Sequence, residues 1–83
     1  MSGVWQVASF ILHVHPERVD AVTRTLTDSP GVQIRAVEGA TLIVVVEGDD
    51  DASFAQRAET LRTHPEVLAA NLVFHQFDFD EES

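Results

Sequence analysis

Three stretches of this chain are rich in β-branched and aliphatic residues and carry apolar side chains at odd and even positions alike. They are Val4–Val14, Ala40–Glu47 and Val67–His75. Their composition predicts β-strands, yet a strand with one face in water should alternate apolar and polar residues. Both faces of the resulting sheet therefore carry apolar side chains and need a cover. Since 83 residues build only one small core, we expect a partner to supply the second cover.

The intervening segments predict two helices and one further strand. Val19, Val22 and Leu26 recur at helical spacing after Pro16, and Phe54, Ala58 and Leu61 do so after the acidic run at 49–51. One of those aspartates is expected to cap the second helix. The predicted order is strand Val4–Val14, helix Pro16–Asp28, strand Val32–Val37, strand Ala40–Glu47, helix Ala52–Thr63 and strand Val67–Gln76.

The order of these elements, βαββαβ, predicts the fold class. A strand, a helix and a second strand occur twice, and right-handed crossovers place both helices on one side of a four-stranded antiparallel sheet. This arrangement is the α+β, ferredoxin-like plait. We expect a single domain over residues 1–77, followed by an acidic flexible tail at 78–83.

The polar residues of the strands predict which face the helices leave open. His13, Arg35, Glu47, Asn71 and His75 all have odd numbers, so the odd positions are assigned to the open face. The even positions then form the core under the helices: Ala8, Phe10, Leu12, Val14, Val32, Ile34, Leu42, Val44, Val46, Leu68, Ala70, Leu72 and Phe74. The candidate binding residues of the open face, which also carries His13 and Thr41, are Trp5, Val7, Ser9, Ile11, Ile43, Val45, Glu47, Asn71, Val73 and His75.

The charge of the chain restricts what this face can bind. Fourteen acidic residues oppose five arginines, giving a formal net charge of −9. Such a field repels nucleic acid and anionic lipid and attracts cationic segments. No run reaches the roughly 20 apolar residues that cross a bilayer, so no membrane insertion is expected. A cationic, apolar peptide is the favoured partner, and self-association through the open face remains an alternative.

The sequence contains no pattern typical of a cofactor, metal or catalytic site. Cysteine is absent, the four histidines lack ligand spacing, and Asp49–Asp51 lacks the glycine and distant glutamate of a calcium loop. No secretory signal opens the chain, so we expect a cytoplasmic protein without cofactors that is not an enzyme.

Five segments resemble the NapD family, the chaperones of the periplasmic nitrate reductase. They are Trp5–Ser9, His15–Arg18, Gly31–Val32, Leu42–Glu47 and Leu72–Gln76. The resemblance implies a ferredoxin-like plait that binds the twin-arginine signal peptide of NapA, the catalytic subunit, in the cytoplasm. It also implies that the bound signal is withheld from export until NapA has received its cofactor. The same plait hosts small-molecule-sensing regulatory domains, which leaves an amino-acid sensor as the alternative.

Overall fold

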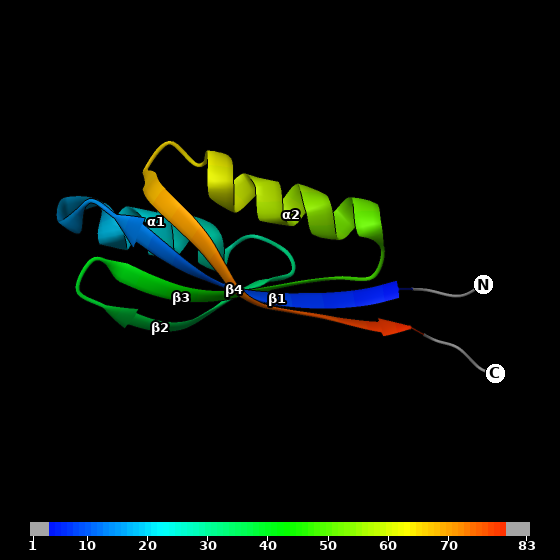
Figure 1. The fold of residues 1–83 in the computed structure, drawn as a ribbon. Helices are drawn as coiled ribbons and strands as arrows, with labels where there is room; N and C mark the ends of the chain where they lie inside the picture. Colours follow the sequence, from blue (N-terminus) through cyan, green and yellow to red (C-terminus); the bar gives the residue numbers. More distant parts are fainter. Residues whose placement is uncertain (1–3, 80–83) are drawn as a thin grey trace.

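The computed structural model describes residues 4–79, which form an antiparallel sheet and two α-helices (Figure 1). The elements are β1 (Val4–Val14), the 3-10 turn η1 (Pro16–Arg18), α1 (Val19–Thr27), β2 (Val32–Glu38), β3 (Thr41–Gly48), α2 (Asp51–Thr63) and β4 (Val67–Phe79). The strand order is β2-β3-β1-β4, so β1 and β3 are central and β2 and β4 are the edges. This topology confirms the predicted ferredoxin-like α+β fold.

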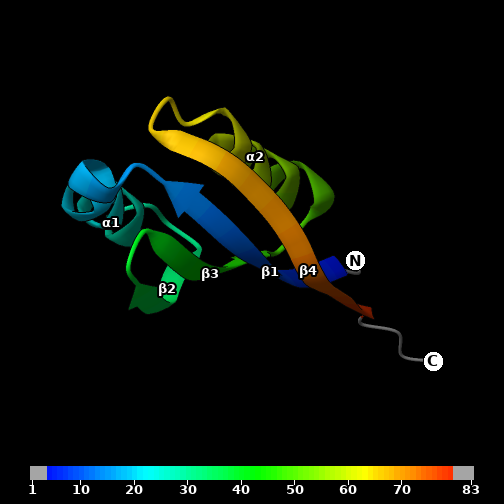
Figure 2. The same cartoon turned by 60° about the vertical axis from the view of Figure 1, so that its left-hand side comes forward.

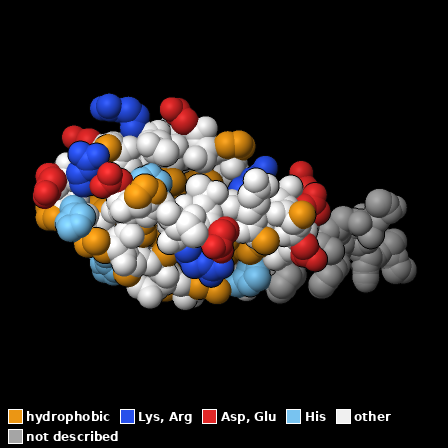
Figure 3. All heavy atoms as spheres, turned by 90° about the horizontal axis from the view of Figure 1, so that it is seen from above, with side chains coloured by type: hydrophobic (Ala, Val, Ile, Leu, Met, Phe, Trp, Pro, Cys, Tyr) orange, Lys and Arg blue, Asp and Glu red, His pale blue; other side chains and the backbone are white. Residues whose placement is uncertain are grey.

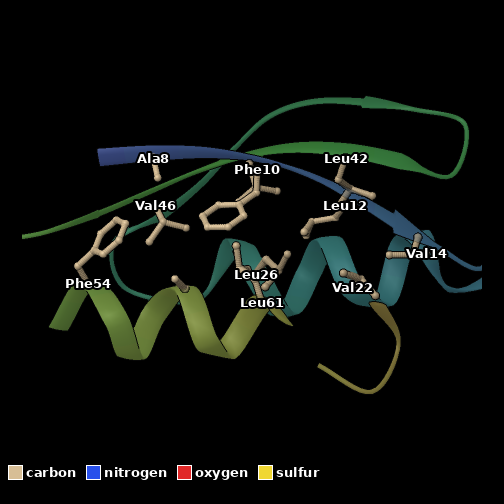
Figure 4. Packing of buried hydrophobic residues seen from close by; sticks show 12 residues of the cluster. Ala8, Phe10, Leu12, Val14, Val22, Leu26, Leu42, Val46, Phe54 and Leu61 are labelled. Carbon is tan, nitrogen blue, oxygen red and sulfur yellow. The ribbon is translucent and has the colours of Figure 1, made fainter. Parts of the chain in front are cut away.

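Both helices lie on one side of the sheet, and the buried side chains fill the space between the two layers (Figure 4). The core takes every even position of the predicted set from β1 and β3, because the pairing of these strands is unbroken from Gln6↔Gly48 to His13↔Thr41. The helices contribute the side chains expected from their spacing. These are Val22 and Leu26 from α1 and Phe54, Ala58 and Leu61 from α2.

The helix starts differ in how they are built. Pro16 opens a 3-10 turn, so α1 begins three residues later than predicted, at Val19. At α2 the Asp50 carboxylate accepts a hydrogen bond of 2.8 Å from the Ser53 backbone N–H, which is the predicted cap. This hydrogen bond lowers the pKa of Asp50 below its usual value, because it favours the charged form.

One contact ties α2 to the end of β3. The Arg57 guanidinium donates a hydrogen bond of 2.7 Å from Nη1 to the Glu47 carbonyl oxygen. The Arg57 guanidinium lies against Gly31, whose φ of 74° falls in the left-handed region. A Cβ at Gly31 would come within 2.8 Å of the same carbonyl oxygen, so the turn before β2 requires glycine.

The last strand is longer than predicted. β4 continues to Phe79, with Asp78 paired to Trp5 and Phe79 to Val4, whereas the sequence predicted an end at Gln76. Since β3 ends opposite Gln6, these final pairs form a two-stranded extension of the sheet. The rest of the predicted tail, residues 80–83, lies outside the described residues.

Candidate binding face of the sheet

The side of the sheet opposite the helices is an apolar surface built from side chains of all four strands. Residues that pair directly across an antiparallel ladder point to the same face, so the register maps this surface. Four rows lie on it. The first spans three strands, Glu47–Val7–Gln76, and the next three run from edge to edge: Gln33–Val45–Ser9–Phe74, Ala36–Ile43–Ile11–Asn71 and Glu38–Thr41–His13–Ala69. We call these residues, together with Trp5, the open face.

The middle of the open face is apolar, and its carboxylates stand at the ends. Val7, Ile11, Ile43 and Val45 lie on the two central strands where the sequence placed them, with Ile43 39% exposed. Ser9 lies on this face as predicted, between Val45 and Phe74 in the second row.

Trp5 lies on the two-stranded extension of the sheet. There it is paired with Asp78 of β4 and is partly exposed. Since it has the same parity as Val7, it extends the open face beyond the first row.

Two β-bulges in β4 change the assignment of its residues. The pairing shifts between Ser9 and Phe10 and again between His13 and Val14, leaving Val73 and Leu68 as the extra residues. Each extra residue reverses the alternation of the strand beyond it. Asn71 therefore lies on the open face as predicted, opposite Ile11, but the residues after Val73 exchange sides.

The prediction that His75 lies on the open face is wrong. His75 pairs with Ala8, and its ring stacks on Phe54 of α2 with centroids 5.1 Å apart and an interplanar angle of 5°. Its Nε2 is 3.1 Å from Oε1 of Gln6, a side chain only 3% exposed whose Nε2 donates to Asp51 Oδ1. His75 is thus part of a polar link between β1, β4 and α2 on the helix side.

The prediction that Phe74 belongs to the core is also wrong, because the bulge turns it to the open face, opposite Ser9. Of the other β4 residues expected in the core, Ala70 packs partly buried against it, whereas Leu68 and Leu72 are exposed. Leu68 is the extra residue of the bulge that lies opposite His13 and Val14. Leu72 lies on the helix side, opposite Phe10, but at the sheet edge, where the helices leave it more than half exposed.

The register adds six residues to the open face that were not predicted from the sequence: Gln33, Ala36, Glu38, Ala69, Phe74 and Gln76. Ala36 reaches this face because β2 has its own register shift between Ile34 and Ala36. The only sequence signal for the bulge in β4 is the unbroken apolar run Leu72–Phe74, where an alternating strand would place a polar residue.

The charges near the open face are unevenly distributed. Among residues 4–79 the ion pairs are Arg18–Glu66 and Arg62–Glu59, and neither involves Glu38 or Glu47. Arg35, in the irregular part of β2, donates to Gln33 Oε1 over 3.5 Å, nearer to Glu38 than to Glu47 in the register. Of the two carboxylates, Glu47 is therefore the one farther from Arg35.

The helix side offers no comparable surface. Seen from above, where α2 lies, charged side chains are mixed with small hydrophobic patches (Figure 3). A groove of about 290 Å³ between the start of β2 and α2 is lined mainly by polar side chains, including Ser53, Gln56 and Thr60. The described part of the chain holds no group of three or more potential metal ligands and no helix suited to crossing a membrane.

Comparisons with known proteins agree on one family. The family described as NapD protein matches residues 5–79. A relative from Escherichia coli (strain K12) named Chaperone NapD is 35% identical over 74 residues, which cover 87% of this chain and 85% of the relative. Chaperone NapD of Paracoccus pantotrophus is 31% identical over 70 residues, covering 84% of this chain and 62% of the relative.

A solved structure resembles the whole fold. It is the solution structure of the E. coli Tat proofreading chaperone protein NapD, with a TM-score of 0.78 and 34% sequence identity. The alignment covers 94% of this chain and 84% of the solved one. The proteins in these comparisons are named chaperones and not enzymes.

Proposed function

The chain belongs to the NapD family of chaperones, and we propose that it binds the twin-arginine signal peptide of the nitrate reductase subunit NapA on its open face. The proposal is supported by the apolar surface on the side of the sheet away from the helices, together with the net charge of −9. A twin-arginine signal combines cationic residues with an apolar stretch and has no fixed structure when free.

The dimensions of the open face suit a helical peptide. The outer rows are six residues apart along β1, a distance of about 20 Å, which a helix of about 13 residues spans. Neighbouring strands are about 4.8 Å apart, so a helix about 10 Å wide covers the central strands and touches Phe74 of β4. Covering roughly 500 Å² of apolar surface contributes about 12 kcal/mol before the cost of ordering the peptide is subtracted.

The charges suggest how the peptide lies. Its arginines are attracted to Glu47 and are disfavoured beside Arg35. The apolar stretch then runs along β1 and β3 toward Thr41 and His13. With the peptide bound in the cytoplasm, the export machinery has no access to the signal until NapA is assembled and the chaperone dissociates.

The test is calorimetric titration of the chain with a synthetic twin-arginine signal peptide. Ile43→Lys places a charge in the apolar centre of the open face, and we expect the affinity to fall by at least about tenfold. Val37→Lys is the matched control, because Val37 is equally exposed, at 43% against 39%, but lies opposite the buried Leu42. Equal losses in the two variants, or no binding of the peptide by the unaltered chain, would rule the proposal out.

A further inference from the structure

β4 is an edge strand whose outer side has no neighbour within the described residues. Its only partner in the sheet is β1, and Figure 2 shows it in orange with β1 on one side and no further strand of the sheet on the other. The outward N–H and C=O groups of such a strand form a row that another extended strand can pair with.

The two edges of the sheet differ in how they are protected. β2 carries Arg35 at its irregularity and Glu38 at its end, and charged residues on an edge strand oppose pairing. β4 has no Asp, Glu, Lys or Arg over residues 67–76. Along this stretch four large apolar side chains are at least half exposed: Leu68 at 58%, Leu72 at 53%, Val73 at 55% and Phe74 at 50%.

We propose that a second copy of this chain pairs antiparallel with the uncharged stretch of β4, residues 67–76. Between the two bulges, over residues 69–72, the row of outward backbone groups is regular and is complementary to itself about a two-fold axis, as a symmetric dimer requires. The stretch itself offers a cationic peptide no carboxylate to pair with, and two copies of it bring no charged side chains together.

The dimer that results contains one continuous sheet of eight strands. Because the two-fold axis is perpendicular to this sheet, both open faces point to the same side and both helix pairs to the other. The pairing therefore leaves the open faces uncovered and does not rest on signal-peptide binding. Ten residues from each copy are fewer than the roughly 20–30 per side of a standard interface, so the dimer is weak and depends on concentration.

The experiment is sedimentation equilibrium of the unaltered chain and of three lysine variants over a wide range of concentrations. We expect Leu72→Lys, on β4, to weaken dimerisation by at least about tenfold, since two like charges face each other near the axis. Ile43→Lys on the open face and Val37→Lys on the other edge should dimerise as the unaltered chain does. Leu72 is more than half exposed, and circular dichroism checks that Leu72→Lys is folded. If Leu72→Lys does not fold, the experiment uses Val73→Lys in its place.

Cross-linking gives a second readout, because the chain has no cysteine. Single cysteines at Leu68, Leu72 and Val73 scan β4, and at least one should form an oxidised dimer faster than a cysteine at Val37. Dimerisation abolished by Ile43→Lys and unaffected by Leu72→Lys would assign the contact to the open face and overturn the proposal. A chain that stays monomeric at millimolar concentration would overturn it as well, without bearing on signal-peptide binding.

Discussion

The bulge at Val73 predicts opposite effects for substitutions at two adjacent residues. Phe74 points to the open face, whereas His75 points to the helices and stacks on Phe54. We therefore expect His75→Ala to lower stability and preserve binding of a twin-arginine peptide, and Phe74→Lys to impair binding with a smaller effect on stability.

The size of the His75→Ala effect can be worked out from two of its contacts. The stacked ring pair contributes about 0.5–1.5 kcal/mol and the hydrogen bond to Gln6 about 0.5–1.5 kcal/mol, so unfolding should be easier by about 1–3 kcal/mol. Gln6 keeps its hydrogen bond to Asp51, and because His75 is exposed, water can replace the imidazole at Gln6 Oε1, so the loss stays within this range. For a domain of this size each kcal/mol corresponds to a Tm decrease of about 4–8 °C.

Phe74→Lys removes a half-exposed ring and should cost about 1 kcal/mol, since only part of a phenylalanine's burial is lost. Urea unfolding gives the stability of each variant, and calorimetry with the peptide gives its affinity. A strand without the bulge would place His75 on the open face and Phe74 in the core. The opposite outcome, in which His75→Ala abolishes binding and Phe74→Lys unfolds the protein, would therefore refute the register.

Two further predictions concern the turns and caps. Gly31→Ala should destabilise the fold by about 1–3 kcal/mol in urea unfolding, because its left-handed φ is strained for alanine and the added Cβ meets a backbone carbonyl; an unchanged midpoint would contradict this. Asp50 has a lowered pKa in the folded state, so the stability it contributes is complete above its unfolded pKa and is lost as the pH falls through the folded one. The advantage of the unaltered chain over Asp50→Asn at pH 7 should therefore shrink at pH 3, and an equal difference at both would contradict the assignment.

The faces on which the residues of the central strands lie could be predicted from sequence, because each of these strands is paired on both sides. β1 is paired on both sides, and its register with β3 has no shift, so the alternation seen in the sequence persists from Ala8 to Val14. The helical stripes were equally predictable, since Val22, Leu26, Phe54 and Leu61 recur at helical spacing and are buried. The fold and the middle of the open face follow from these residues alone.

The edge strands could not be assigned in the same way. An edge strand has a neighbour on one side only, so it tolerates an extra residue, and both β4 and β2 contain one or more irregularities. One extra residue reverses every later side chain, which is why His75 and Phe74 were exchanged. Sequence alternation cannot locate a bulge inside an apolar run such as Leu72–Phe74, where either parity places a hydrophobic residue on each face.

The extra residue Val73 connects the two surfaces for which functions are proposed. By reversing the strand after it, the bulge turns Phe74 to the open face, which extends the apolar surface to the fourth strand. It also turns His75 to α2, where stacking on Phe54 and the bond to Gln6 fix the strand beyond the bulge. Leu72, just before the bulge, stays outside the cover of the helices and leaves an apolar, uncharged edge. Because the face and the edge share this strand but point in different directions, a peptide on one and a second copy on the other can be bound at the same time.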